Sequence, residues 1–268
     1  MAKAFVFSGG GAYAVPELGI VKYIEEARLF NPDTDLAIGT SFGAIAAGSL
    51  TLNHSPQNML KMLEDFDKIS RKVLTSSSIA WSAFSFPFLW GLKSLINILA
   101  PYFGGFENNK TWPKGLITCS TDLTTFSPFY FNDATFASDQ IPVLEAVASS
   151  ASIPFVFQPV SHHGHVFVDG GIVENVPTTP AEEKEEIYVF GHQPGRNYRV
   201  AIDSLESYFG AIVEGAIFRL NEMNTVYEQQ DNFIGYHSQA KHILDFSNYQ
   251  TDFQEGYQKA KAYFERRN

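Results

Sequence analysis

The sequence predicts an α/β fold of three layers, α/β/α, with a mostly parallel central sheet and additional C-terminal helices. Two observations support this prediction. Short apolar strand patterns alternate with helical patterns through the first 190 or so residues, which is typical of a parallel sheet covered on both faces. Over residues 204–227 and 253–266 the hydrophobic spacing becomes helical, with no strand pattern.

The expected elements follow one another along the chain. A strand at 4–7 precedes a helix at 17–29, for which Pro16 suits the first turn. A strand at 35–38 leads into a helix of small residues at 42–52. The later strands are expected at 116–120, 127–131, 166–169 and 187–190, with a helix at 142–149 and a solvated helix face over the charged run 182–186.

Composition excludes several classes of protein. A formal net charge of -10 argues against a nucleic-acid partner, which would require a basic surface. The single cysteine, Cys119, excludes an intrachain disulfide and any metal site built from several cysteines. The N-terminal apolar run is too short for a signal peptide. We therefore expect a cytoplasmic protein, with peripheral membrane association and signal-independent export left open.

Three consecutive glycines, Gly9, Gly10 and Gly11, follow the first strand. Glycine lets the backbone approach a ligand closely, and a loop that opens a helix directs its N–H groups at an anion. The anion is either a nucleotide pyrophosphate or the oxyanion of an acyl transfer. Because Gly9-x-Gly11-x-x-Ala14 also fits the loose dinucleotide fingerprint, the loop alone does not decide between them.

A Gly-x-Ser-x-Gly motif lies between the second strand and the helix that follows it. The motif consists of Gly39, Thr40, Ser41, Phe42 and Gly43. This is the pattern of a nucleophile elbow, in which a sharp turn exposes the serine hydroxyl. The helix also directs its positive end at charge that develops on a substrate. The motif predicts a catalytic Ser41.

A catalytic serine needs a base to accept its proton. None of the seven histidines has a distinctive neighbourhood, although His192, His237 or His242 would suit the order serine, acid, histidine. A carboxylate is the alternative, since Asp169 follows an apolar strand, at an edge where sites of α/β sheets assemble. Taken alone, Asp169 and the following Gly170 favour an ordinary turn.

Together, these motifs resemble those of the patatin-like phospholipases. The matching segments occur in the family's order and are Ser8–Gly11, Gly39–Gly43, Thr118–Leu123, Ala148–Val160, Asp169–Gly171 and Gly171–Pro177. The resemblance spans roughly Ala4 to Pro180. It does not extend to residues 79–109 or beyond about Gly191.

The resemblance implies a patatin-like catalytic domain over residues 4–190 and a mainly helical extension over 191–268, packed on the same domain. It implies a lipid-degrading serine acyl hydrolase of phospholipase A or esterase type, acting on glycerophospholipids or related esters through an acyl-serine intermediate. Ser41 would be the nucleophile and Asp169 its general base, followed by Gly170 and Gly171. The amides of Gly9, Gly10 and Gly11 would form the oxyanion hole. No metal or cofactor is required.

The sequence departs from the family pattern beside both motifs. Tyr13 and Ala14 stand where the family usually carries a basic residue followed by glycine. Phe42 replaces a residue that is usually small or aliphatic, and it is expected to crowd the acyl pocket. These departures bear on substrate preference more than on activity.

Residues 79–109 form an aromatic-rich insertion that Pro87 and Pro101 break. It is too interrupted for a membrane-spanning helix. One interpretation is an insertion into the core. Our hypothesis is a lid that docks on lipid through Trp81, Phe88 and Trp90, because such side chains prefer the headgroup boundary.

Two other classes of function stay open. A nucleotide-binding oxidoreductase would use the glycine loop and an acid such as Asp33 or Asp35 at the ribose. Against it, Ala14 occupies the third glycine position, and the elbow and Asp169 would have no role. The other alternative is a catalytically inactive lipid-binding module, against which the retention of Ser41 and Asp169 argues.

Overall fold

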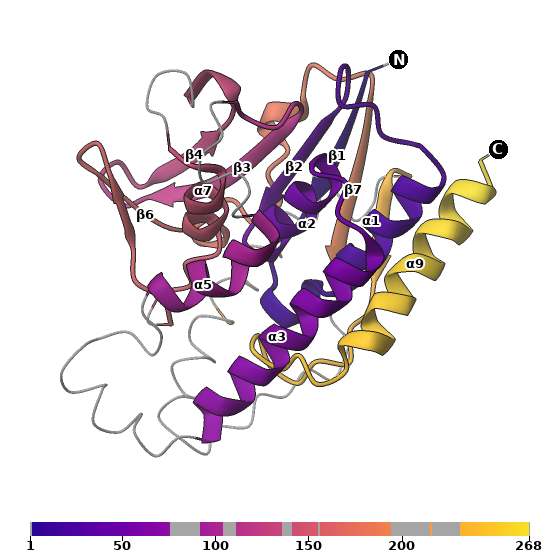
Figure 1. Ribbon diagram of the computed structural model, residues 1–268. Helices are drawn as coiled ribbons and strands as arrows, with labels where there is room; N and C mark the ends of the chain where they lie inside the picture. Colours follow the sequence, from indigo (N-terminus) through magenta and orange to yellow (C-terminus); the bar gives the residue numbers. More distant parts are fainter. Residues whose placement is uncertain are drawn as a thin grey trace.

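The computed structural model describes residues 2–75, 92–103, 111–135, 141–154, 156–193, 215 and 231–267 (Figure 1). The strands are β1 (Lys3–Phe7), β2 (Leu36–Thr40), β3 (Leu116–Asp122), β4 (Ser127–Phe131), β5 (Val160–His162), β6 (His165–Asp169), β7 (Glu186–His192) and β8 (Phe233–Tyr236). The α-helices are α1 (Pro16–Glu26), α2 (Phe42–Thr51), α3 (Pro56–Thr75), α5 (Leu92–Phe103), α7 (Val143–Ser150) and α9 (Tyr249–Glu265). Short 3-10 turns are η1 (Gly11–Ala14), η3 (Gly170–Ile172) and η4 (Thr179–Ala181).

All eight strands belong to one sheet in the order β5-β6-β3-β2-β1-β7-β8, with β4 paired to β3. Strands β3, β2, β1, β7 and β8 run parallel, whereas β4, β5 and β6 pair antiparallel. The antiparallel pairs β3–β4 and β5–β6 are joined by short turns, which permit only that direction. The predicted α/β fold with a helix-flanked central sheet is confirmed, and the sheet is mixed.

Strand β1 lies at the point where the strand order reverses. The chain leaves β1 for β2 and β3 on one side and later returns to β7 and β8 on the other. Ligands of open α/β sheets bind outside the carboxyl ends of the strands at such a reversal. The glycine loop after β1 and the elbow after β2 both lie there.

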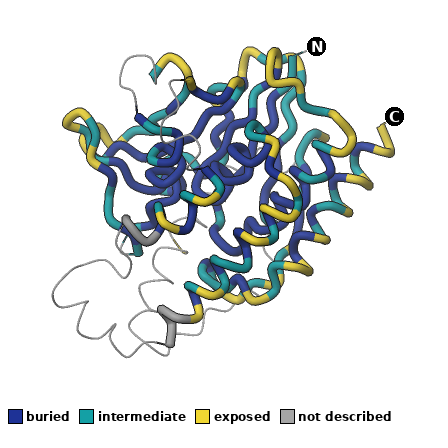
Figure 2. Tube along the Cα trace, in the orientation of Figure 1, coloured by how far each residue is buried: buried dark blue, intermediate teal, exposed yellow. Residues whose placement is uncertain are grey.

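Alternate side chains of β1 divide the core between the two faces of the sheet. Phe5 and Phe7 are buried in the larger hydrophobic cluster, which includes side chains of α1, α2 and α9. Ala4 and Val6 point the other way and join a smaller cluster with Ala181 of η4. The central strands are accordingly buried on both faces (Figure 2).

The C-terminal helix α9 packs directly on α1, with backbone against backbone. A Cβ atom on Gly19 would lie 1.8 Å from the carbonyl oxygen of Phe253, and one on Gly256 would lie 1.7 Å from that of Pro16. Phe253 is 1% exposed. The last part of the chain therefore shares the core of the first helix.

Several local predictions were wrong. The charged run 182–186 was expected to be a solvated helix face. Instead, η4 ends at Ala181, and the run forms a turn that leads into β7. Pro101 lies inside α5. The helix continues for two residues beyond it, so the proline does not interrupt the helix where it stands. Strand β8 was missed because four residues with an internal glycine give too short a pattern, and α3 was also missed. Of the expected helix at 204–227, only residue 215 is described.

Candidate active site

Ser41 occupies the turn between β2 and α2 in a backbone conformation that is unusual for a side-chain-bearing residue. Its φ is 55° and its ψ is −124°, a combination that is retained where the surrounding structure enforces it. A Cβ atom on Gly39 would lie 2.1 Å from the carbonyl oxygen of Gly43, and one on Gly43 would lie 2.4 Å from that of Phe7. Both glycines of the motif are therefore required by close backbone contacts.

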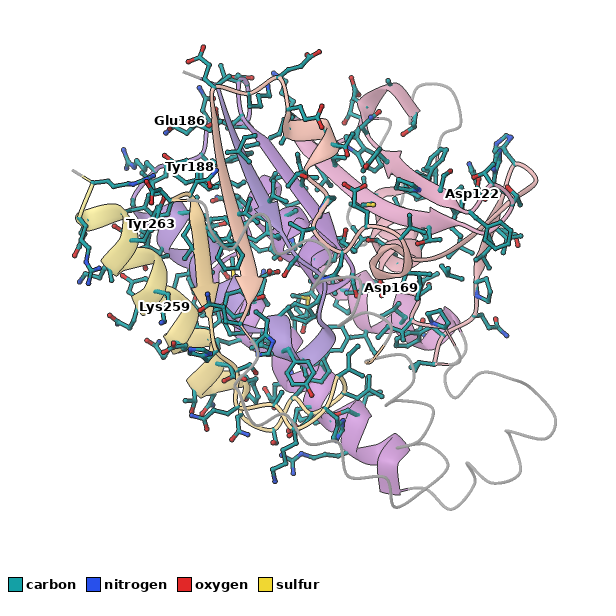
Figure 3. All side chains as sticks on the ribbon, turned by 180° about the vertical axis from the view of Figure 1, so that it is seen from behind. Asp122, Asp169, Glu186, Tyr188, Lys259 and Tyr263 are labelled. Carbon is teal, nitrogen blue, oxygen red and sulfur yellow. The ribbon has the colours of Figure 1, made fainter. Side chains whose placement is uncertain are left out.

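The Ser41 hydroxyl donates a hydrogen bond of 2.6 Å to Oδ2 of Asp169. Asp169 ends β6, which pairs with β3, and β3 pairs with the strand that precedes Ser41. The second carboxylate oxygen, Oδ1, accepts the backbone N–H of Gly171 at 2.8 Å. The carboxylate is buried near the middle of the molecule, whereas Asp122, which is also buried, lies towards one side among the hairpins (Figure 3).

Burial raises the pKa of Asp169 to about 7, although the hydrogen bonds from Ser41 and Gly171 act to lower it. A group with a pKa near neutrality can both accept and return a proton at physiological pH. Asp169 is thus electrostatically suited to proton transfer with the hydroxyl that it contacts.

Ser150, the last residue of α7, and Ser152, just beyond the helix, hydrogen-bond the backbone of the pair. The Ser150 hydroxyl accepts the Ser41 N–H at 2.9 Å and donates to the carbonyl of Cys119 at 2.5 Å. The carbonyl of Ser152 accepts the Asp169 N–H at 2.9 Å. In the sequence these serines are marked only as part of a segment that resembles the family. Their contacts with Ser41 and Asp169 were not predictable, because they depend on tertiary structure.

The glycine loop passes directly beside Ser41. A Cβ atom on Gly9 would lie 3.1 Å from the Ser41 Cβ, and Gly11 has a φ of +52°. The Gly9 N–H donates to the backbone carbonyl of Asn175 at 3.0 Å. Within the described ranges, the N–H groups of Gly10 and Gly11 donate to no backbone carbonyl. Among the described residues, two of the three predicted oxyanion donors thus make no backbone hydrogen bond through their N–H groups, whereas the N–H of Gly9 is bonded to Asn175.

Asn175 is a residue of this site that sequence analysis did not single out. Its side-chain Nδ2 donates to the Gly9 carbonyl at 3.2 Å, so Asn175 binds both polar groups of the Gly9 backbone. Its Oδ1 is buried and has no hydrogen-bond partner among the described residues. A Cβ atom on Gly171 would lie 2.8 Å from that oxygen. Its position six residues after Asp169 in a family-like segment was the available signal.

A buried carboxyl group supports the other end of the glycine loop. Glu17 Oε1 accepts the Ser8 N–H at 3.0 Å, the Ser8 hydroxyl at 3.3 Å and the Tyr236 hydroxyl at 2.9 Å. Burial raises the pKa of Glu17 well above its ordinary value.

Tyr13, which stands where the family usually has a cation, is buried and stacks on His192 with ring centroids 5.1 Å apart. The surroundings of the loop are therefore neutral and aromatic.

The three candidate histidines make other contacts. Burial lowers the pKa of His192 to about 4. His237 hydrogen-bonds the carbonyl of Gln193 at 2.9 Å, and His242 Nδ1 accepts the Leu244 N–H at 3.3 Å. The Ser41 hydroxyl is bonded to Asp169 instead.

The described residues include neither a metal-binding cluster nor a membrane-spanning helix. The described part of the chain contains no cluster of three or more histidine, cysteine, aspartate or glutamate side chains able to hold a metal ion. Within the same ranges, no helix combines the length and the apolar character needed to cross a bilayer. Trp81, Phe88 and Trp90 lie outside the described residues, so lipid docking through them stays a prediction.

The mixed α/β sheet carries a serine on a strained strand-to-helix turn, hydrogen-bonded to a buried carboxylate, which is the arrangement that the sequence motifs led us to expect. The chain belongs to the patatin-like phospholipase family, whose model matches residues 5–182. The resemblance noted from the motifs is thereby confirmed.

Individual relatives agree with this assignment. The chain is similar to Lysophospholipase NTE1 of Meyerozyma guilliermondii, with 22% identity over 237 residues, covering 86% of this chain and 15% of that protein. It is also similar to the uncharacterized protein R571 of Acanthamoeba polyphaga mimivirus, with 27% identity over 191 residues, covering 66% of this chain and 60% of that protein. The chain thus spans only a small part of the yeast relative.

A solved structure shows the same fold. VipD from Legionella pneumophila matches with a TM-score of 0.52 and 14% identity, over 98% of this chain and 66% of that chain. The likeness concerns the fold alone. Family and relatives together support a lipid hydrolase.

Proposed function

We propose that this chain is a serine lipid acyl hydrolase of phospholipase A or esterase type, with Ser41 as nucleophile and Asp169 as general base. The observation that carries the proposal is the 2.6 Å hydrogen bond between Ser41 Oγ and Asp169 Oδ2. The strained turn at Ser41 supports it, because nucleophile elbows hold their serine in this way.

In the proposed first step, Asp169 accepts the Ser41 proton while Oγ attacks the ester carbonyl carbon. The carbonyl electron pair moves to oxygen, and the N–H groups of Gly10 and Gly11 stabilise the oxyanion. The tetrahedral intermediate collapses to an acyl-serine, and Asp169 returns the proton to the leaving alcohol. Removal of one oxyanion donor typically lowers turnover by about 10²–10³-fold.

In the second step, Asp169 accepts a proton from a water molecule that attacks the acyl-serine carbonyl. Collapse of the second tetrahedral intermediate releases the fatty acid and returns the proton to Ser41 Oγ. Both steps need the ionised carboxylate at the start, and the pKa of Asp169, about 7, provides it above neutrality.

A lipid ester is the proposed substrate because an apolar cavity opens at Ser41, with Phe42, Ile45 and Ile153 in its wall. Such a cavity suits an acyl chain and offers nothing to a charged headgroup. Since NTE1 of Meyerozyma guilliermondii is named a lysophospholipase, lysophospholipids are the first class that we would test.

A serine-directed fluorophosphonate, followed by peptide mapping, tests the proposal. We expect the label on Ser41 and hydrolysis of lysophosphatidylcholine, both lost in Ser41→Ala. Ser49→Ala is the matched control, because Ser49 is a buried serine on the same helix. Label on another serine, or hydrolysis by Ser41→Ala, would contradict the proposal.

A second pair of variants tests the base. Asp169→Asn should lose hydrolysis, whereas changes at His192, His237 and His242 should retain it. Activity that persists in Asp169→Asn and disappears with one histidine would replace the pair by a serine–histidine arrangement. A folded chain that binds lipid vesicles but neither reacts with the probe nor hydrolyses esters would be the inactive lipid-binding module.

A further inference from the structure

The lining of the cavity at Ser41 includes three neighbouring aromatic side chains, which we call the aromatic wall: Phe42 of α2, Phe66 of α3 and Phe246. The cavity volume is about 30 Å³, which corresponds to roughly two water-sized groups. The space beside the nucleophile is therefore small as well as apolar.

The three rings lie close to one another. The Phe66 and Phe246 rings are stacked, with centroids 5.2 Å apart and planes 23° apart. Phe42 lies 6.2 Å from Phe66 and 6.1 Å from Phe246. Each of the three side chains is at most 5% exposed. The wall is a packed part of the core.

Phe246 belongs to a segment of residues 241–248, which we call the strap. The strap also contributes Ile243 to the cavity wall. The Ile243 carbonyl accepts the Ala12 N–H at 2.8 Å, and a Cβ atom on Gly11 would lie 2.5 Å from that carbonyl oxygen. The strap thus rests directly on the proposed oxyanion loop.

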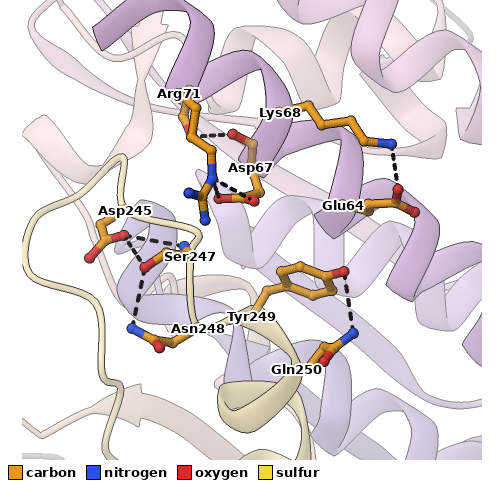
Figure 4. A network of polar contacts seen from close by, with 10 residues as sticks. Glu64, Asp67, Lys68, Arg71, Asp245, Ser247, Asn248, Tyr249 and Gln250 are labelled. Carbon is orange, nitrogen blue, oxygen red and sulfur yellow. Dashed lines mark hydrogen bonds and ion pairs between the residues drawn. The ribbon is translucent and has the colours of Figure 1, made fainter. Parts of the chain in front are cut away.

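The other side of the strap faces α3. Arg71 is bonded to Asp67 at 2.9 Å, and Asp67, with a smaller contribution from Asp245 of the strap, raises the pKa of Arg71 (Figure 4). Asp245 in turn accepts the Ser247 hydroxyl at 2.6 Å. The strap thus has bonds within its own turn beside α3, the helix that carries Phe66.

We propose that Phe66 and Phe246 form the end of the acyl-chain subsite and set the longest acyl chain that Ser41 accepts efficiently. This inference rests on the proposed function. The strap lies outside residues 5–182, which match the family, so Phe246, unlike Phe42 and Phe66, comes from a segment beyond the family match. A longer chain fits only when one of the two rings is displaced, and this displacement lowers its kcat/KM.

The test compares soluble p-nitrophenyl esters from butyrate to laurate on the full chain. We expect Phe66→Ala and Phe246→Ala each to raise the ratio of kcat/KM for laurate over butyrate by at least about tenfold, the usual effect of a methylene-sized change in an apolar pocket. Phe66→Trp should shift the preference towards the shorter ester.

Phe131→Ala is the matched control. Phe131 is 2% exposed and packs with Phe129 and Phe167, outside the cavity lining. The ratio of kcat/KM for laurate over butyrate in Phe131→Ala should equal that of the wild type. If an alanine variant does not fold, Phe66→Leu and Phe246→Leu provide the same comparison with less loss of packing.

The outcomes separate the two claims. The inference about the aromatic wall alone is overturned if the folded Phe66 and Phe246 variants keep the wild-type ratio of kcat/KM for laurate over butyrate while fluorophosphonate still labels Ser41. Absence of both labelling and ester hydrolysis in the wild type overturns the proposed function and the inference together.

Discussion

Asn175 binds both polar groups of the Gly9 backbone. Its backbone carbonyl accepts the Gly9 N–H at 3.0 Å, and its side-chain amide donates to the Gly9 carbonyl at 3.2 Å. The two hydrogen bonds hold the glycine loop beside Ser41. Under the proposed function, Asn175 is a positioning residue, because it contacts the loop whose next two N–H groups are the proposed oxyanion donors.

Replacement of Asn175 by alanine should therefore lower kcat more than it raises KM. We expect a loss of about 10–100-fold in kcat, somewhat less than the loss of an oxyanion donor itself. Steady-state kinetics on a soluble ester would measure it. Asn232→Ala is the matched control, because the Asn232 side chain also donates to a backbone carbonyl, that of Ile187 at 2.6 Å, which lies beside Ala4 of β1 and not beside the glycine loop. Equal kinetics for both variants would show that the contact is merely structural.

The activity should rise with pH through the pKa of Asp169, which is about 7. The proposed mechanism uses the ionised carboxylate, so the rate is low where Asp169 is protonated and reaches a plateau above about pH 8. A profile of kcat/KM from pH 5 to 9 on an ester with a neutral leaving alcohol measures this. A flat profile across pH 6 to 8 would be inconsistent with Asp169 as the base.

Asp169→Asn should be more stable than the wild type at pH 8, although inactive. Burial raises the pKa of Asp169 in the folded state, so the native protein binds the proton more tightly than the unfolded chain does. Stability contributed by this group is full below about pH 4 and is lost as pH rises through about 7. The shift corresponds to about 4 kcal/mol, part of which the lost hydrogen bonds to the ionised carboxylate offset.

A net stabilisation of about 1–2 kcal/mol is the expected result of that substitution at pH 8. At pH 4 the difference should be near zero or reversed. Thermal unfolding at both values of pH measures it, with Asp33→Asn as a control, because the Asp33 side chain is exposed. A variant that is less stable than the wild type at pH 8 would contradict the electrostatic account.

Gly256→Ala should destabilise the protein, whereas glycine-to-alanine changes inside helices ordinarily stabilise by up to about 1 kcal/mol. The new Cβ would lie 1.7 Å from the Pro16 carbonyl, so α9 must move away from α1. We expect a loss of about 1–3 kcal/mol or more, measured by denaturant unfolding. Gln258→Ala, at an exposed position of the same helix, should change stability by less than about 0.5 kcal/mol.

The elements that position the proposed nucleophile and base were predictable because each has a local signal. Ser41 lies in a five-residue motif between a strand and a helix, and Asp169 ends an apolar strand before two glycines. Family order then connected residues that are 128 positions apart, and the structure brings them within 2.6 Å. Their catalytic roles stay a prediction until the variants are measured.

The surroundings of this pair were not predictable in the same way. The bond between Asn175 and Gly9 joins residues 166 positions apart without any sequence pattern of its own. The strap has no regular secondary structure, so periodicity could not show that Ile243 and Phe246 would meet Gly11 and Phe66. Phe42 was expected to crowd the acyl pocket, and it lines the cavity at Ser41.

The contact between the strap and the glycine loop sets an order on the maturation of the site during synthesis. A nascent chain that ends at residue 182 contains Gly11, Ser41 and Asp169, but it lacks Ile243 and Phe246. The wall of the cavity can form only after these late residues leave the ribosome and fold back onto the first loop. A chain synthesised only as far as residue 182 therefore lacks part of the wall of the proposed site.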